Sequence, residues 1–101
     1  MPIIGERQRL TRKNVQSAPA AAGVYALYVE GELAFYGAAR GGEHTIRSRL
    51  SEHLAGRGSP SGLKAAMFSY EVTRFPMSRE CALLEEHRRT NHALPPFNQA
   101  Q

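Results

Sequence analysis

The pattern of apolar and polar positions predicts a β-hairpin in the first half of the chain. Residues 23–30 are mostly strand-forming types, and residues 33–36 form a second, shorter apolar run. The segment Glu30-Gly31-Glu32 between the two runs is typical of a tight turn. Residues 37–44 contain three of the nine glycines, so we expect a loop after the hairpin.

Apolar residues then recur at helical spacing. Ile46, Leu50 and Leu54 are four residues apart and would share one face of a helix over residues 45–54. Thr45 is a residue type that favours the N-cap of such a helix.

The remaining part of the chain predicts one more strand and one more helix. Apolar and polar residues alternate over residues 67–75, and residues 79–91 are helical in character, with Ser78 as the expected N-cap. Residues 94–98 contain two prolines and are expected to be extended. The order strand-strand-helix-strand-helix indicates an α+β domain with a small antiparallel or mixed sheet.

Length and composition limit the class of protein. The chain has 101 residues, which is enough for one domain, and we expect a basic lead-in over residues 1–21 followed by a domain over residues 22–101. With 42% hydrophobic and 22% charged residues, the composition excludes a wholly disordered chain. The sequence contains neither an apolar run of membrane-spanning length nor the apolar core of a signal peptide. A single cysteine, Cys81, excludes an intramolecular disulfide framework, so we expect a cytoplasmic protein with no membrane contact.

The charged residues are of unusual types. The net charge is +4, and eleven of the thirteen basic residues are arginine, whose planar fork suits contact with phosphate. A net charge of this size also serves solubility alone, so the charge leaves both interpretations open. All nine acidic residues are glutamate, which disfavours nucleases built on clustered aspartates.

Five residues on different predicted elements form a candidate set for cleaving a phosphodiester bond. Tyr25 lies on the first strand, Arg49 and His53 lie four residues apart on the first helix, Glu80 begins the second helix, and Asn98 is near the C-terminus. A phenol can attack or relay a proton, an arginine can stabilise phosphoryl charge, and a glutamate can hold a metal ion. Taken singly, each residue also fits core packing, a solvated helix face or a favourable place in the helix dipole.

The order of these residues resembles the GIY-YIG nuclease domain. Residues 23–25 (Gly-Val-Tyr) resemble its first motif, and residues 35–37 (Phe-Tyr-Gly) stand in the place of its second. Residues 49–53 resemble its arginine and histidine pair, residues 80–84 its glutamate segment, and residues 96–98 its closing segment. The resemblance extends over residues 22–98 and implies a three-stranded antiparallel sheet flanked by helices.

The resemblance also implies an activity, which is the hydrolysis of DNA with one Mg²⁺ or Mn²⁺ ion. It implies that Tyr25 is a base or a positioning phenol, that Arg49 stabilises charge on the phosphate, and that His53 assists proton transfer. Glu80 would hold the metal ion, and Asn98 would tie the end of the chain to the site by hydrogen bonds.

Further residues are expected to contact the substrate, and one residue competes for the metal ion. Arg40, Arg47 and Tyr36 are the expected substrate-binding residues. Glu85 is an alternative metal ligand, but arginines follow it at the third and fourth positions, where apolar residues follow Glu80. We therefore prefer Glu80.

The second motif departs from the family pattern. Phe35 stands in place of a tyrosine, and a phenyl ring cannot donate, accept or relay a proton. Tyr36 follows directly, but adjacent strand residues point to opposite faces of a sheet. Three functions therefore remain open: a metal-dependent DNA endonuclease that uses Tyr25, a nucleic-acid-binding module with weakened catalysis, and a protein-interaction domain. Specificity for one DNA target would then come from a protein partner, a homodimer or the structure of the DNA.

Overall fold

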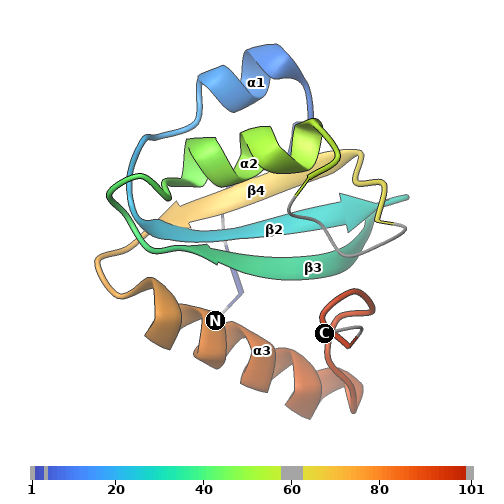
Figure 1. Cartoon of the computed structure of the whole chain (residues 1–101). Helices are drawn as coiled ribbons and strands as arrows, with labels where there is room; N and C mark the ends of the chain where they lie inside the picture. Colours follow the sequence, from blue (N-terminus) through green and yellow to red (C-terminus); the bar gives the residue numbers. More distant parts are fainter. Residues whose placement is uncertain (1, 4, 58–62, 100–101) are drawn as a thin grey trace.

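The fold consists of one antiparallel sheet with helices on both faces (Figure 1). The structure is a computed structural model that describes residues 2–3, 5–57 and 63–99. The sheet has the strand order β1-β4-β2-β3. The elements, in chain order, are β1 (Gln8–Arg9), α1 (Arg12–Gln16), β2 (Gly23–Val29), β3 (Glu32–Ala39), α2 (Ile46–Leu54), β4 (Met67–Val72) and α3 (Pro76–Asn91).

The predicted hairpin is confirmed, and its second strand is longer than expected. Glu30 and Gly31 form the two-residue turn with φ of 51° and 81°, as a tight hairpin turn that follows the sheet twist requires. The predicted loop over residues 37–44 was partly wrong, because β3 continues to Ala39. Gly37 pairs with Tyr25 across the two strands, so the ladder extends through residues whose own strand propensity is low.

The sheet has a fourth strand that the sequence analysis did not predict. Strand β1 has two residues and pairs with β4, with Gln8 opposite Phe68. Helix α1 follows, with Thr11 as its N-cap, and its Val15 is buried in the core. The described part of residues 1–21 therefore packs on the rest of the chain.

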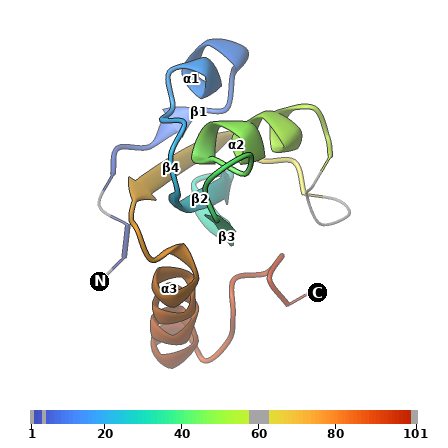
Figure 2. The same cartoon turned by 60° about the vertical axis from the view of Figure 1, so that its left-hand side comes forward.

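Helices α1 and α2 cover one face of the sheet and α3 covers the other, as Figures 1 and 2 show. Strand β2 is buried on both faces. Tyr25 and Leu27 point toward α2, while Val24 and Ala26 belong to the cluster that contains Leu83 of α3. Alternate residues of one strand thus enter the two halves of the core.

The helix ends match the sequence in one case and differ in the other. Thr45 is the N-cap of α2, as predicted from its residue type. It also forms a reciprocal capping box with Ser48. The expected N-cap of α3 at Ser78 was wrong, because the helix already begins at Pro76, a residue that suits the first helical position.

The end of the described chain folds back onto β3. The extended segment expected over residues 94–98 is instead partly a turn, with the Asn98 N–H donating to the Pro95 carbonyl at 3.0 Å. The Phe97 N–H donates to the Ala34 carbonyl on β3 at 2.9 Å. Within the described ranges, none of the helices combines the length and apolar character that crossing a membrane requires.

Candidate active site

A cavity of about 390 Å³ lies beside the outer strand β3. Tyr25 of β2 and three residues of β3, Phe35, Gly37 and Ala38, form its sheet side. Tyr25, Phe35 and Gly37 share one face because the residues of a strand alternate and Tyr25 is paired with Gly37.

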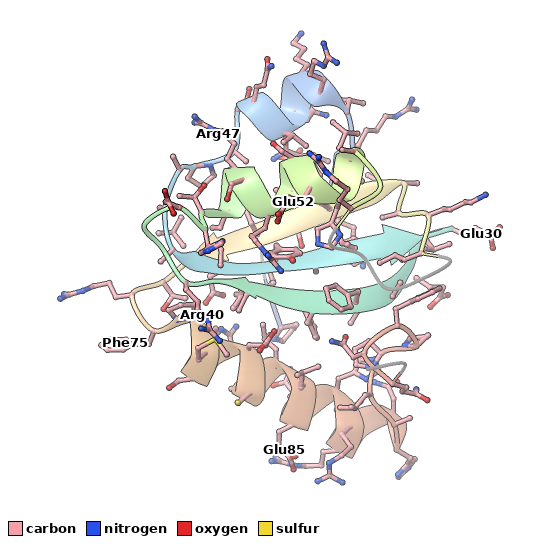
Figure 3. All side chains as sticks on the ribbon, viewed as in Figure 1. Glu30, Arg40, Arg47, Glu52, Phe75 and Glu85 are labelled. Carbon is pink, nitrogen blue, oxygen red and sulfur yellow. The ribbon has the colours of Figure 1, made fainter. Side chains whose placement is uncertain are left out.

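Four polar or charged side chains from other segments complete the cavity. Arg40 and His44 come from the loop after β3, Arg49 comes from α2, and Glu80 comes from α3, which also contributes Met77. Figure 3 shows Arg40 above the beginning of α3. Residues of α2 and α3, which lie on opposite faces of the sheet, can line the same cavity because β3 is an edge strand and the cavity extends around that edge.

The phenol of Tyr25 is buried and bonded to a buried histidine. The Tyr25 Oη lies 2.8 Å from Nε2 of His53, and the two residues are only 1% and 8% exposed. Burial raises the pKa of Tyr25 to about 12, although the nearby Arg49 acts in the opposite direction. Burial, with a contribution from Arg49, lowers the pKa of His53 to about 4. Both groups are therefore neutral at pH 7.

Gly37 allows this phenol to reach the edge of the sheet. A Cβ atom at Gly37 would lie closer than 3.0 Å to three atoms at the tip of Tyr25, namely Cζ, Oη and Cε2. Any other residue at this position would push the phenol out of place.

Arg49 adds a positive charge to the lining of the cavity. Its Nη1 forms an ion pair with Glu52 Oε1 at 3.2 Å, while Nε is buried and has no hydrogen-bond partner among the described residues. Arg49 is also among the residues that line the cavity, so its positive charge is suited to an anionic oxygen that enters there.

Glu80 is the one carboxylate among the residues that line the cavity. It is half-buried, and burial raises its pKa, with the charge of Arg40 acting in the opposite direction. The described residues contain no cluster of three metal-ligating side chains. A single carboxylate in an open cavity nevertheless fits Mg²⁺, which is commonly held by one or two carboxylates together with water and substrate phosphate.

Glu85, the alternative metal ligand, points elsewhere. Its Oε1 lies 2.5 Å from Nη2 of Arg88 in an exposed ion pair on α3, and Glu85 does not line the cavity. The interaction with Arg88 lowers the pKa of the Glu85 carboxyl. Figure 3 shows Glu85 on the underside of α3, away from the sheet and from Arg40.

Besides His53, which contacts Tyr25 but does not line the cavity, three other residues expected at the site lie outside it. Arg47 Nε donates to the Ala18 carbonyl at 2.8 Å and so holds the connector before β2. Tyr36 is buried in the cluster on the α3 face of the sheet. The Asn98 side chain accepts from the Tyr36 N–H at 2.9 Å and donates to the Tyr36 carbonyl at 3.0 Å. Asn98 therefore fastens the end of the chain to the strand that carries Phe35 and Gly37, behind the site.

Sequence reasoning did not place Gly37, Ala38, His44 or Met77 at the site, although all four line the cavity. Had the predicted strand over residues 33–36 been extended by three residues, the alternation of side chains would have placed Gly37 on the same face as Phe35. No periodic signal marks Met77, because it follows the corner at which α3 begins.

Comparisons with known proteins add no assignment. The chain matches no family model, and it matches neither a curated protein nor a solved structure.

Proposed function

We propose that the protein is an endonuclease that hydrolyses phosphodiester bonds of DNA with one Mg²⁺ or Mn²⁺ ion, as its resemblance to the GIY-YIG nucleases implies. One observation carries the proposal. Tyr25, Arg49 and Glu80, which lie on three different elements, line the same cavity, and His53 is bonded to the phenol from behind. These are the groups that the chemistry requires: a proton acceptor, a phosphate-binding cation and a metal-binding carboxylate.

Two arginines account for substrate binding. Arg49 and the exposed Arg40 both line the cavity and bring positive charge to it. Together they would hold a phosphate whose charge increases in the transition state, where fixed donors in a partly enclosed site have their greatest effect.

The Tyr25–His53 pair accounts for proton transfer. A neutral imidazole has one ring nitrogen that accepts a hydrogen bond, and Nε2 faces the Tyr25 hydroxyl. In the tautomer in which Nε2 accepts, Tyr25 would pass its proton to Nε2 while its oxygen takes a proton from the attacking water. Because a pKa of about 4 makes His53 a weak base, this transfer would need a water acidified by the bound metal ion. The phenol stays neutral throughout, which agrees with its raised pKa of about 12.

Glu80 is the residue that would hold the metal ion. A bound divalent ion neutralises phosphate oxygens and acidifies water, which the protein side chains do not do by themselves. The half-buried position of Glu80 keeps its carboxylate poorly hydrated and therefore ready to bind a cation.

Phe35 favours a second candidate function, which is a nucleic-acid-binding module with weakened catalysis. Its ring centroid lies 5.9 Å from that of His53 and 6.4 Å from that of Tyr25, and it lines the cavity. A hydroxyl at this place would face the substrate, and the phenyl ring has none.

The proposal is tested by incubating single-stranded, duplex, nicked and branched DNA with the protein in Mg²⁺, Mn²⁺ or EDTA. We expect metal-dependent cleavage that is lost in Glu80→Gln and kept in Glu85→Gln, a matched control on the same helix. Cleavage that persists in Glu80→Gln, or in EDTA, would refute the proposed site.

The same assay distinguishes the alternatives. Salt-sensitive DNA binding without cleavage would support the binding module, and cleavage that appears only in Phe35→Tyr would show that catalysis has decayed. The absence of both binding and cleavage would contradict both functions and favour a protein partner.

A further inference from the structure

We propose that the exposed ring of Phe75 stacks on an unpaired base next to the cavity, so that the substrate is DNA with a single-stranded segment rather than an uninterrupted duplex. The inference rests on the proposed function, because it takes the cavity as the phosphate site. Phe75 is 69% exposed and lies at the corner between β4 and α3. Met77 and Val72, on either side along the chain, are 44% and 56% exposed.

The fold does not use Phe75 for packing, but it holds the backbone of Phe75 in place. The Phe75 N–H donates to Thr73 Oγ1 at 3.1 Å, and its carbonyl accepts from the Arg79 N–H at 3.0 Å. The next residue, Pro76, is buried and restricts the backbone before it. A ring presented from a fixed corner loses little conformational freedom on binding, and this is what makes a rigid aromatic residue a good binding element.

The position of Phe75 connects it to the cavity. Met77, two residues further on, lines the cavity together with Arg40. Figure 3 shows Phe75 projecting outward at the end of the molecule where Arg40 also lies. A strand whose phosphate is held by Arg40 and Arg49 can therefore place a neighbouring base against Phe75.

The chemistry of this corner favours an unpaired base over a protein partner. Arg74, directly before Phe75, is exposed, and the exposed Arg40 lies at the same end of the molecule, so this corner carries positive charge beside the aromatic ring. Aromatic rings among cationic side chains are typical of surfaces that bind single-stranded nucleic acid. Bases inside an uninterrupted duplex are covered by their neighbours, whereas an unpaired base has a free face.

A fluorescence experiment tests the stacking directly. The chain contains no tryptophan, so Phe75→Trp introduces a single indole at the proposed contact. In EDTA, where a metal-dependent reaction does not proceed, we expect single-stranded and flap DNA to quench the indole emission and blunt duplex to leave it nearly unchanged. The inference would be overturned if duplex DNA quenched the emission equally, or if none of the DNAs quenched it.

Affinity measurements in EDTA separate this inference from the nuclease proposal. Phe75→Ala should weaken binding of single-stranded and flap DNA by roughly 5- to 150-fold and leave duplex affinity unchanged. Val72→Ala, which truncates a neighbouring exposed apolar residue outside the cavity lining, should leave both affinities within about twofold, well below the change expected from lost stacking. An equal loss for all DNAs, or no loss, contradicts stacking whatever the cleavage assay shows. A Phe75-dependent preference for unpaired DNA without any cleavage would support stacking and contradict the nuclease.

Discussion

Replacing Gly37 with alanine should destabilise the protein and displace the Tyr25 hydroxyl. Gly37 lies on β3 and is not among the residues with positive φ, so its backbone accepts any residue. An alanine at such a strand position normally stabilises a protein by about 0.5–1 kcal/mol relative to glycine. Here the added methyl would lie closer than 3.0 Å to the tip of Tyr25, so the expected sign is reversed.

The magnitude follows from the contacts of Tyr25. Carbon atoms in good contact are about 3.5–4.0 Å apart, so the phenol must move by about an ångström or more. Overpacking of this kind costs about 1–3 kcal/mol. Breaking the buried 2.8 Å hydrogen bond to His53 adds about 1–3 kcal/mol, because both partners lose their contact with water. After subtraction of the alanine gain, the free energy of unfolding should fall by about 3 kcal/mol, to within a factor of two.

Urea denaturation of Gly37→Ala measures this change, and a double-mutant cycle with Tyr25→Ala assigns it. In the Tyr25→Ala background the methyl has no phenol to meet, so the destabilisation by Gly37→Ala should disappear. Cleavage should also fall by about a hundredfold, because misplacing a reacting group by an ångström has effects of that size. A Gly37→Ala protein that is as stable as the wild type, or more stable, would refute the proposed close approach.

Three further predictions concern other parts of the site. Burial raises the pKa of Glu80, which indicates that the buried carboxylate is unfavourable for folding. Glu80→Gln should therefore increase thermal stability at pH 7 while it abolishes cleavage. A loss of thermal stability in this variant would contradict that reasoning. The pKa of His53 falls from 6.5 to about 4 on folding, so the unfolded chain binds the proton more tightly. The wild type should therefore lose up to about 3 kcal/mol of stability as the pH falls from 6.5 to 4, and His53→Gln should lose much less in urea titrations over that range. Asn98→Ala removes both hydrogen bonds to the Tyr36 backbone and should cost about 1–3 kcal/mol, measured by urea denaturation, with the cleavage rate of the folded fraction unchanged.

Local signals were sufficient for the hairpin and for α2. The turn at Glu30-Gly31 and the cap at Thr45 depend on residues within a few positions of each other, and both were predicted. Strand β1 could not be predicted, because two residues carry no periodic signal and their partners on β4 lie about sixty positions away. The extension of β3 through Gly37 depends likewise on pairing with β2, not on the residue's own propensity.

The candidate site shows the same division. The sequence named Tyr25, Arg49 and Glu80, and the structure brings them to one cavity. The sequence could not show that Arg40 lines the cavity and Arg47 does not, because the side of α2 that faces the edge of β3 is decided by packing. It also could not show that Phe75 remains uncovered, since an aromatic residue at the end of an alternating segment is as consistent with a core position.

In the proposed reaction, the phenol of Tyr25 takes part in the cleavage of a phosphodiester bond. Tyr28 provides a matched control, because it lies on the same strand, is buried, and is bonded to Ser69 Oγ at 2.9 Å on the opposite face of the sheet. The most direct measurement is the single-turnover cleavage rate of Tyr25→Phe and Tyr28→Phe on single-stranded DNA in Mg²⁺. We expect a loss of about 10²- to 10⁴-fold in Tyr25→Phe and wild-type rates for the folded Tyr28→Phe protein. Equal rates in the two variants would contradict this expectation.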